Sequence, residues 1–205
     1  MTSRVTRYPV SCVLLAILCT VFVVKLHGDP ATVHQERILA FQAYTGITSK
    51  PLMVAYREAD TNNSGYLSYN EVVSFQKRVV SRFIYRGNST ALRPDQFLVA
   101  GGGDCDDFAL FTAGMLRYYG WEPYIGALDD GKSPYGHAVC LSYEESAKPA
   151  ELSAYDIKAG SLVVGSKPGL YVPIDYEKVG GLSAVGPDWR LIRVYTPESM
   201  YGMRL

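Results

Sequence analysis

The sequence of 205 residues predicts an α+β fold, because two different hydrophobic periods occupy different parts of the chain. Apolar residues recur at helical spacing over residues 34–44, 52–59 and 71–85, and again after Asp104. Five strand-like runs follow, at residues 122–128, 137–143, 161–164, 170–176 and 189–195. One helix followed by strands at hairpin-like spacing indicates a helix packed on an antiparallel sheet.

The first element is an apolar segment at residues 10–24, which is uncharged and is preceded by Arg4 and Arg7. It fits the upper end of a signal-peptide core and is short for a bilayer span of roughly 20 residues. No small-residue cleavage site follows, so we expect residues 1–27 to act as a signal anchor, a membrane segment that is uncleaved or inefficiently cleaved. A buried helix of a soluble protein is the alternative. Positive charge before the segment predicts a cytoplasmic N-terminus and an exported body, periplasmic or extracellular.

Composition and charge are those of a globular protein, with 48% hydrophobic and 20% charged residues. The whole chain is neutral, but without Arg4, Arg7 and Lys25 it keeps 17 basic and 20 acidic side chains. This balance gives no basic footprint, so nucleic acid is excluded as a partner. Beyond the apolar segment only Cys105 and Cys140 remain, and they could pair, although two cysteines make no disulfide framework.

Residues 28–86 are expected to form a helical region around a calcium loop at residues 60–71. This loop follows the 12-residue EF-hand pattern, with Gly65 at the sharp turn and Ser68 where a water often intervenes. The predicted Ca²⁺ ligands are the side chains of Asp60, Asn62, Ser64 and Glu71 and the backbone carbonyl of Tyr66. Because only two of them are carboxylates, we expect modest affinity. A polar turn that binds no metal is the alternative.

Residues 87–101 indicate a linker, and residues 102–205 a second domain that opens with a helix. Asp104 stands where an N-cap belongs, with Asp107 three residues later at capping-box spacing. The apolar residues that follow form one core-facing stripe: Phe108, Phe111, Met115 and Leu116. Gly120 is expected to end this helix.

Cys105 therefore falls in the first turn of a helix, where unpaired amides and the helix dipole favour a thiolate. Asp106 and Asp107 oppose it, since nearby carboxylates disfavour another anion, so an imidazolium would have to outweigh them. His137 is the only histidine after residue 35, and it opens a strand-like run. Asp175 lies near the end of another such run, where its carboxylate could orient the imidazole.

Four short segments surround these residues: 103–109 (GDCDDFA), 116–120 (LRYYG), 136–138 (GHA) and 173–175 (PID). Together they resemble the transglutaminase-like superfamily, and most closely its bacterial cysteine proteinases, over roughly residues 101–182. The resemblance implies a papain-like core with a catalytic triad of Cys105, His137 and Asp175. It also implies an exported, calcium-dependent enzyme that acts on protein substrates, such as a cell-surface protein. Val139 replaces the aromatic residue usual after the family's histidine, which bears on specificity.

The leading interpretation is a membrane-anchored, calcium-binding cysteine peptidase in which Cys105 attacks a carbonyl group. The same triad could instead transfer the acyl group to an amine, as a transglutaminase does. A cell-wall amidase of the NlpC/P60 type also places a cysteine on a helix and a histidine on a strand, but Asp175 speaks against it. A calcium-binding surface domain without activity is the non-enzymatic alternative. For the oxyanion hole, the backbone N–H of Cys105 is the expected first donor and Gln96 a candidate for the second.

Overall fold

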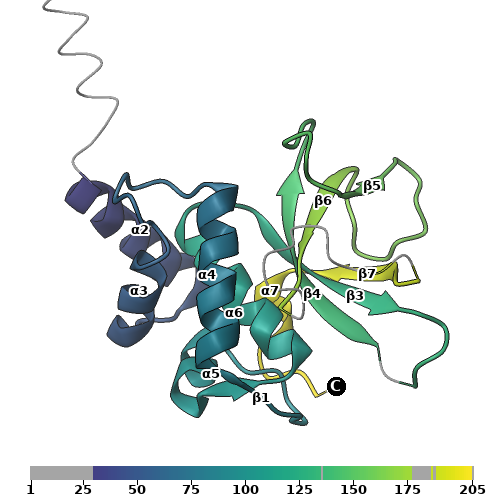
Figure 1. Cartoon of the computed structure of the whole chain (residues 1–205), viewed down its shortest axis with the longest axis horizontal. Coiled ribbons are helices and arrows are strands. Elements are labelled where there is room, and N and C mark those ends of the chain that lie inside the picture. Colours follow the sequence, from purple (N-terminus) through teal and green to yellow (C-terminus); the bar gives the residue numbers. More distant parts are fainter. Residues whose placement is uncertain (1–29, 135, 177–185, 187, 205) are drawn as a thin grey trace, which may run out of the picture.

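The computed structural model describes residues 30–134, 136–176, 186 and 188–204 (Figure 1). Its helices are α2 (Pro30–Thr45), α3 (Lys50–Arg57), α4 (Tyr69–Arg82), α5 (Pro94–Ala100), α6 (Cys105–Tyr118) and α7 (Pro197–Met200). Its strands are β1 (Ile84–Tyr85), β2 (Gly102–Gly103), β3 (Pro123–Asp129), β4 (His137–Glu144), β5 (Tyr155–Ile157), β6 (Gly169–Ile174) and β7 (Arg190–Tyr195). The predicted membrane segment, residues 1–27, lies outside the described residues. Within them, no helix is long and apolar enough to cross a bilayer.

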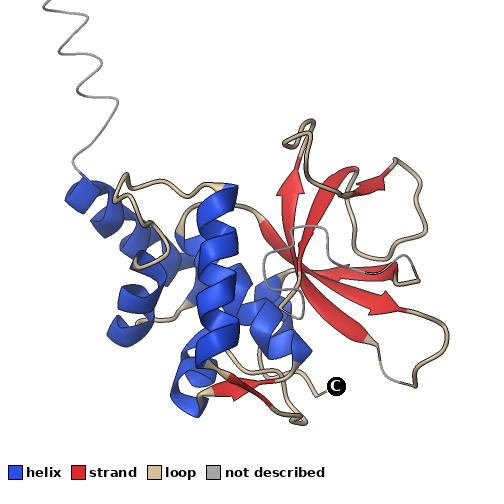
Figure 2. Cartoon of the chain, in the orientation of Figure 1, coloured by secondary structure: helices blue, strands red, loops and turns tan. Residues whose placement is uncertain are grey.

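Five strands form one antiparallel sheet in the order β5-β6-β4-β3-β7. β3 and β4 form a hairpin at its centre, with Ile125 opposite Cys140. Figure 2 shows the sheet on one side of the molecule and most of the helices on the other. The predicted α+β class, with a helix packed on an antiparallel sheet, is confirmed.

Helix α6 lies between the sheet and the other helices, in contact with β3, β4, α2, α5 and α7. The four side chains of the predicted apolar stripe are all at most 2% exposed: Phe108, Phe111, Met115 and Leu116. Full burial of each such side chain stabilises the fold by about 1.5–3 kcal/mol relative to exposure. Gly120, with a φ of +78°, follows the end of α6, as the sequence predicts.

Helices α3 and α4 flank the predicted calcium loop, and each begins with a serine cap. The Ser49 side chain accepts a hydrogen bond from Leu52 N–H at 3.4 Å at the start of α3. At the start of α4, Ser68 Oγ accepts from Glu71 N–H at 3.3 Å, and Glu71 Oε2 accepts from Ser68 N–H at 3.0 Å. This reciprocal capping box fixes the exit of the loop.

The helical region and the residues after 102 share one hydrophobic core. Tyr56 of α3 is fully buried and packs on Phe111 of α6, with ring centroids 5.3 Å apart. Its hydroxyl donates to the Phe111 carbonyl at 2.9 Å. The predicted calcium loop is thereby joined to the helix that carries Cys105 through one packed layer.

Helix α5 lies within residues 87–101, where the sequence indicated a linker. Its Phe97 is fully buried, with its ring centroid 4.9 Å from that of Phe111. At seven residues, α5 is too short for a helical period to show in the sequence.

Residues 161–164 do not form the predicted strand. Only Val164 pairs, in a single bridge to Arg193 beside β7. Gly160 and Gly165 bracket the segment with φ values of +83° and +78°, which strand residues do not adopt, so the chain stays a loop there. The three-residue strand β5 forms the sheet edge instead.

Candidate active site

Two glycines set the starting position of α6. Gly102 pairs with Ile84 in the short parallel sheet β1–β2, with a φ of +144°. A Cβ added to Gly102 would lie 1.9 Å from the Ile84 carbonyl oxygen, and one added to Gly103 would lie 2.0 Å from Asp107 Oδ2. No side chain fits at either position. This close backbone approach fixes where Cys105 begins the helix.

Asp104 is the N-cap residue of α6, as predicted, and its backbone N–H donates to Asp107 Oδ2 at 3.1 Å. Two residues that sequence reasoning missed add further donors. Leu92 N–H donates to Asp107 Oδ1 at 2.6 Å, and Asn88 N–H donates to Asp104 Oδ2 at 3.1 Å. Burial raises the pKa of Asp107 to about 6, and hydrogen bonds from Leu92 N–H, Asp104 N–H and the Asn88 side-chain amide limit the rise.

The side chains of Asp104, Asp106 and Asp107 form a cluster of three carboxylates around the start of α6, with one oxygen from each within 4.8 Å of the others. Asp106 is buried, and neither its Oδ2 nor Asp104 Oδ1 has an N–H or hydroxyl donor among the described residues. Burial raises the pKa of Asp106, and the hydrogen bond it shares with Asp104 when protonated raises it further. Buried oxygens without donors fit a hard cation such as Ca²⁺.

His137 and Asp175 lie side by side on neighbouring strands. His137 opens β4, and Asp175 directly follows β6, which pairs with β4. His137 Nε2 lies 3.1 Å from Asp175 Oδ1, and their side chains are 9% and 3% exposed. Cys105 also acts on His137, since a hydrogen bond to its side chain and its charge both raise the pKa of the imidazole. The structure therefore brings the three predicted catalytic residues together.

The environment of His137 favours its charged form. Burial by itself would lower the pKa of this imidazole. The hydrogen bonds to Asp175 and Cys105, and the negative charges of both partners, outweigh burial and raise the pKa to about 10. At neutral pH His137 is therefore an imidazolium beside a sulfur atom, which is the arrangement that stabilises a thiolate.

Two aromatic side chains flank the His137 ring. The ring centroids of Tyr176 and Trp189 lie 5.8 Å and 5.6 Å from that of His137. Tyr176 also stacks on Tyr85, with centroids 5.4 Å apart and planes within 10°. Apolar neighbours lower the local dielectric constant and strengthen the hydrogen bond from the imidazole to its carboxylate. Sequence reasoning missed both rings, although Tyr176 directly follows the predicted carboxylate.

Two other residues from the sequence analysis have different environments. Cys140 is fully buried on β4, and burial raises the pKa of its thiol well above the ordinary 9.0. Cys105 and Cys140 are both free thiols, so the disulfide that the sequence left open does not form. Gln96 is exposed, and its Oε1 accepts from Arg93 N–H at 2.9 Å at the start of α5. Gln96 therefore caps a helix, and nothing supports it as an oxyanion donor.

In the loop at residues 60–71, four predicted calcium ligands meet around Ser64. Its N–H donates to Asp60 Oδ1 at 2.9 Å and to Asn62 Oδ1 at 2.8 Å. Its hydroxyl donates to the Tyr66 carbonyl at 3.1 Å. His34 of α2, which the sequence did not single out, lies with Nε2 3.5 Å from Asp60 Oδ2. Oxygen atoms of the kind Ca²⁺ prefers are thus gathered in one loop.

Glu71, the fifth predicted ligand, closes the loop from its other end. Its Oε1 accepts from Thr61 N–H at 3.0 Å, and its Oε2 accepts from the Ser68 hydroxyl at 2.8 Å. Burial would raise the pKa of Glu71, but these hydrogen bonds hold it below the usual value. Gly65 turns the loop with a φ of +81°, as expected. These hydrogen bonds close the loop at residues 60–71, and its assignment as an EF-hand stays a prediction.

No protein-family profile and no curated protein matches the sequence. Among solved structures, Legionella pneumophila LapG treated with EGTA is 16% identical over 79% of this chain and 81% of LapG, with a TM-score of 0.49. Calcium-bound LapG is 16% identical over 79% of this chain and 83% of LapG, with a TM-score of 0.48. A candidate cysteine protease from Cytophaga hutchinsonii is 15% identical over 71% of this chain, with a TM-score of 0.45. The match spans 41% of that protein. Similarity at this level assigns no function, so the function has to be argued from the residues.

Proposed function

We propose that this chain is a cysteine peptidase of transglutaminase-like type that cleaves protein substrates with Cys105, His137 and Asp175. The observation that carries the proposal is the buried pair of His137 and Asp175, with Nε2 3.1 Å from Oδ1, beside the side chain of Cys105. These three side chains are of the types that act as nucleophile, base and orienting carboxylate. A buried imidazolium–carboxylate pair is costly to desolvate and is weak evidence for a role in stability, which favours a chemical role.

In this mechanism the Cys105 thiolate attacks the carbonyl carbon of the scissile peptide bond. The backbone N–H of Cys105, which has no partner within its helix, is the first donor to the oxyanion. The His137 imidazolium gives its proton to the departing amine as the C–N bond breaks, leaving a thioester. Water then loses a proton to His137 and attacks the thioester, which releases the acid and restores the ion pair. Asp175 keeps the imidazole oriented throughout.

We also propose that the loop at residues 60–71 binds Ca²⁺ through Asp60, Asn62, Ser64, Tyr66 and Glu71. All five donors are oxygen atoms, and two carry charge. Their clustering around Ser64 supports the assignment. The ion would stabilise the pairing of α3 with α4 and would take no part in the reaction.

The cluster of carboxylates from Asp104, Asp106 and Asp107 is a second candidate site for a divalent cation. Its support is the pair of buried oxygens without donors. A cation there would offset the negative charges that oppose a thiolate on Cys105. Calcium affinity measured in Glu71→Gln and in Asp106→Asn separates the two sites, since each variant should weaken only its own.

We further propose that residues 1–27 anchor the chain in the membrane with the folded part on the periplasmic or extracellular side. The support is the apolar run with positive charge on its N-terminal side. Proteinase added to intact spheroplasts should then degrade the folded part. Complete protection until lysis would refute this topology.

The peptidase proposal is tested by labelling the full-length protein with a thiol-reactive acyl probe. Cys105 should label at least about 100-fold faster than in His137→Ala, the lower end of what a positioned base contributes. Cys140 provides an internal control, because it is buried in the same molecule. If Cys105 labels no faster than Cys140, and His137→Ala changes nothing, the chain is not a cysteine enzyme. Transfer of the acyl group to an added amine, without hydrolysis, would favour the transglutaminase alternative.

A further inference from the structure

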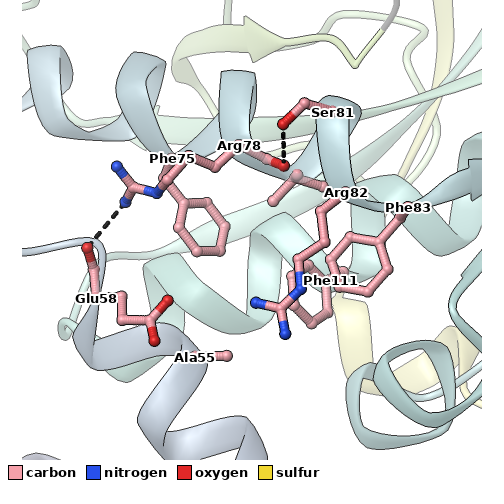
Figure 3. Close-up of a pocket in the computed structure, with 9 residues that line it drawn as sticks. Ala55, Glu58, Phe75, Arg78, Ser81, Arg82, Phe83 and Phe111 are labelled. Atoms are coloured by element: carbon pink, nitrogen blue, oxygen red, sulfur yellow. Dashed lines mark hydrogen bonds between the residues drawn. The ribbon is translucent and has the colours of Figure 1, made fainter.

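A cavity of about 240 Å³ lies among α3, α4 and α6, on the helical side of the molecule (Figure 3). Its lining residues are Ala55, Glu58, Phe75, Arg78, Val79, Ser81, Arg82, Phe83 and Phe111. None of them belongs to the proposed triad or to the loop at residues 60–71. The cavity is therefore separate from both the proposed catalytic site and the proposed calcium loop.

Three phenylalanine rings form the apolar part of this cavity. Phe75 and Phe111 are buried and stack with centroids 6.0 Å apart and planes within 15°. Phe83 packs edge-on against Phe111 at 5.3 Å. An engineered apolar cavity of about 150 Å³ holds a benzene molecule. A cavity of about 240 Å³ therefore has room for one ring or branched chain with a short extension.

The mouth of the cavity carries two guanidinium groups. Arg78 donates from Nη2 to the Glu58 carbonyl at 2.8 Å, so its position is fixed. Arg82 lies over the Phe83 ring at 5.7 Å and makes no ion pair within 4.0 Å among the described residues. The Glu58 carboxylate faces the same space, also without an ion pair in the described part of the chain (Figure 3). Two positive charges and one negative leave the mouth net positive.

We propose that this cavity binds an apolar carboxylate, with its ring or alkyl group among the three phenylalanines and its carboxylate on Arg82. A guanidinium fork binds a carboxylate through two parallel hydrogen bonds, which suits the carboxylate better than a point charge would. A neutral apolar ligand would leave Arg82 without an anion, and a simple anion would leave the rings uncovered. The carboxylate can belong to a free aryl or alkyl acid or to the C-terminal Phe or Leu of a peptide.

The direct test is a titration of the full-length protein with 3-phenylpropionate, followed by NMR of the Ala55 and Val79 methyl groups, which line the cavity. We expect saturable shifts at these methyl groups with a Kd of about 1 mM, as suits so small a ligand. Neutral 3-phenylpropionamide should bind about fivefold more weakly, because it forms no ion pair. Equal binding of acid and amide, or no saturable shift by about 20 mM ligand, would overturn the proposal.

Matched variants on one helix test the role of Arg82. Arg82→Gln should weaken the acid about fivefold and leave the amide unchanged. Lys77→Gln removes an equally exposed charge from α4 outside the cavity and should change nothing. Glu58→Gln should tighten binding of the acid, because it removes the carboxylate that faces the same space. Equal losses in Arg82→Gln and Lys77→Gln would mean general surface attraction and no site.

The two sources of the carboxylate are separated by N-acetyl-glycyl-phenylalanine and its C-terminal amide. If the peptide acid binds more tightly than 3-phenylpropionate and the peptide amide does not, the natural ligand is a peptide C-terminus. If the free acid binds more tightly than the peptide acid, it is a small organic acid. In either case the apolar carboxylate is confirmed as the ligand class.

Discussion

Replacing Asp175 with Asn should shift the pH range over which Cys105 is reactive. His137 Nε2 lies 3.1 Å from Asp175 Oδ1. At that distance and an effective dielectric constant of about 20, Coulomb's law gives an attraction of about 5 kcal/mol. That energy corresponds to a pKa shift of at most about 4 units, while opposite charges in proteins usually shift a pKa by about 1–3 units. Asn keeps the shape and the hydrogen bond but removes the charge, so the pKa of His137 should fall from about 10 by about 2 units.

The assay is the rate of alkylation of Cys105 by iodoacetamide as a function of pH, read by peptide mass spectrometry. Cys12→Ser and Cys19→Ser remove the two cysteines of the N-terminal segment, and Cys140 is buried. The alkylation rate of Cys105 should change around the pKa of His137, because the imidazolium stabilises the thiolate. We expect this change near pH 10 in the parent and near pH 8 in Asp175→Asn. An unmoved transition would show that Asp175 does not hold the charge on His137, and the reasoning would fail.

The same pair links folding stability to pH. The folded pKa of His137, about 10, lies above its ordinary value of 6.5. The stabilisation it contributes is therefore fully present below pH 6.5 and is lost as the pH rises to about 10. Urea unfolding should show the largest difference between the parent and Asp175→Asn near pH 6, with the gap closing above pH 10.

Three further predictions concern calcium, the core and the start of α6. With a Kd of about 10⁻⁴ M, 1 mM Ca²⁺ should stabilise the protein by about 1.4 kcal/mol and raise Tm by about 3–6 °C. Glu71→Gln should remove the part of this rise that comes from the loop at residues 60–71, and the idea fails if the melt of the parent does not respond to calcium. Tyr56→Phe removes the hydrogen bond to the Phe111 carbonyl and should lower stability by about 1 kcal/mol in urea unfolding. Gly103→Ala forces a Cβ against Asp107, so it should cost about 1–3 kcal/mol and slow Cys105 labelling; a normal labelling rate would contradict the packing argument.

Local signals in the sequence predicted the helix of the nucleophile and its partners. The N-cap at Asp104, the helical stripe after it and the single histidine after residue 35 are all signals that span a few residues. They single out Cys105 and His137, and the resemblance to the transglutaminase-like superfamily implies the triad with Asp175. The structure brings those three side chains together because β4 and β6 are neighbours in the sheet and α6, which begins at Cys105, packs on β4.

Contacts between distant segments escaped the sequence analysis. Asn88 and Leu92 reach the carboxylates of α6 only because β1 pairs with β2 and turns residues 87–94 across the start of that helix. Trp189 packs against His137, although it lies directly before β7 and is distant from His137 in the sequence. Helix α5 was not predicted because seven residues are too few to show a helical period of apolar residues. The false strand at residues 161–164 has apolar residues but lies between two glycines of positive φ.

The central claim is that Cys105 cleaves peptide bonds, and a comparison of exported proteins tests it most directly. New protein N-termini should be identified by mass spectrometry in cells with the parent chain and in cells with Cys105→Ala at equal expression. The account predicts a set of cleavage sites that occurs only with Cys105 and that is also lost in His137→Ala. Identical sets of N-termini in the parent and in Cys105→Ala would contradict it.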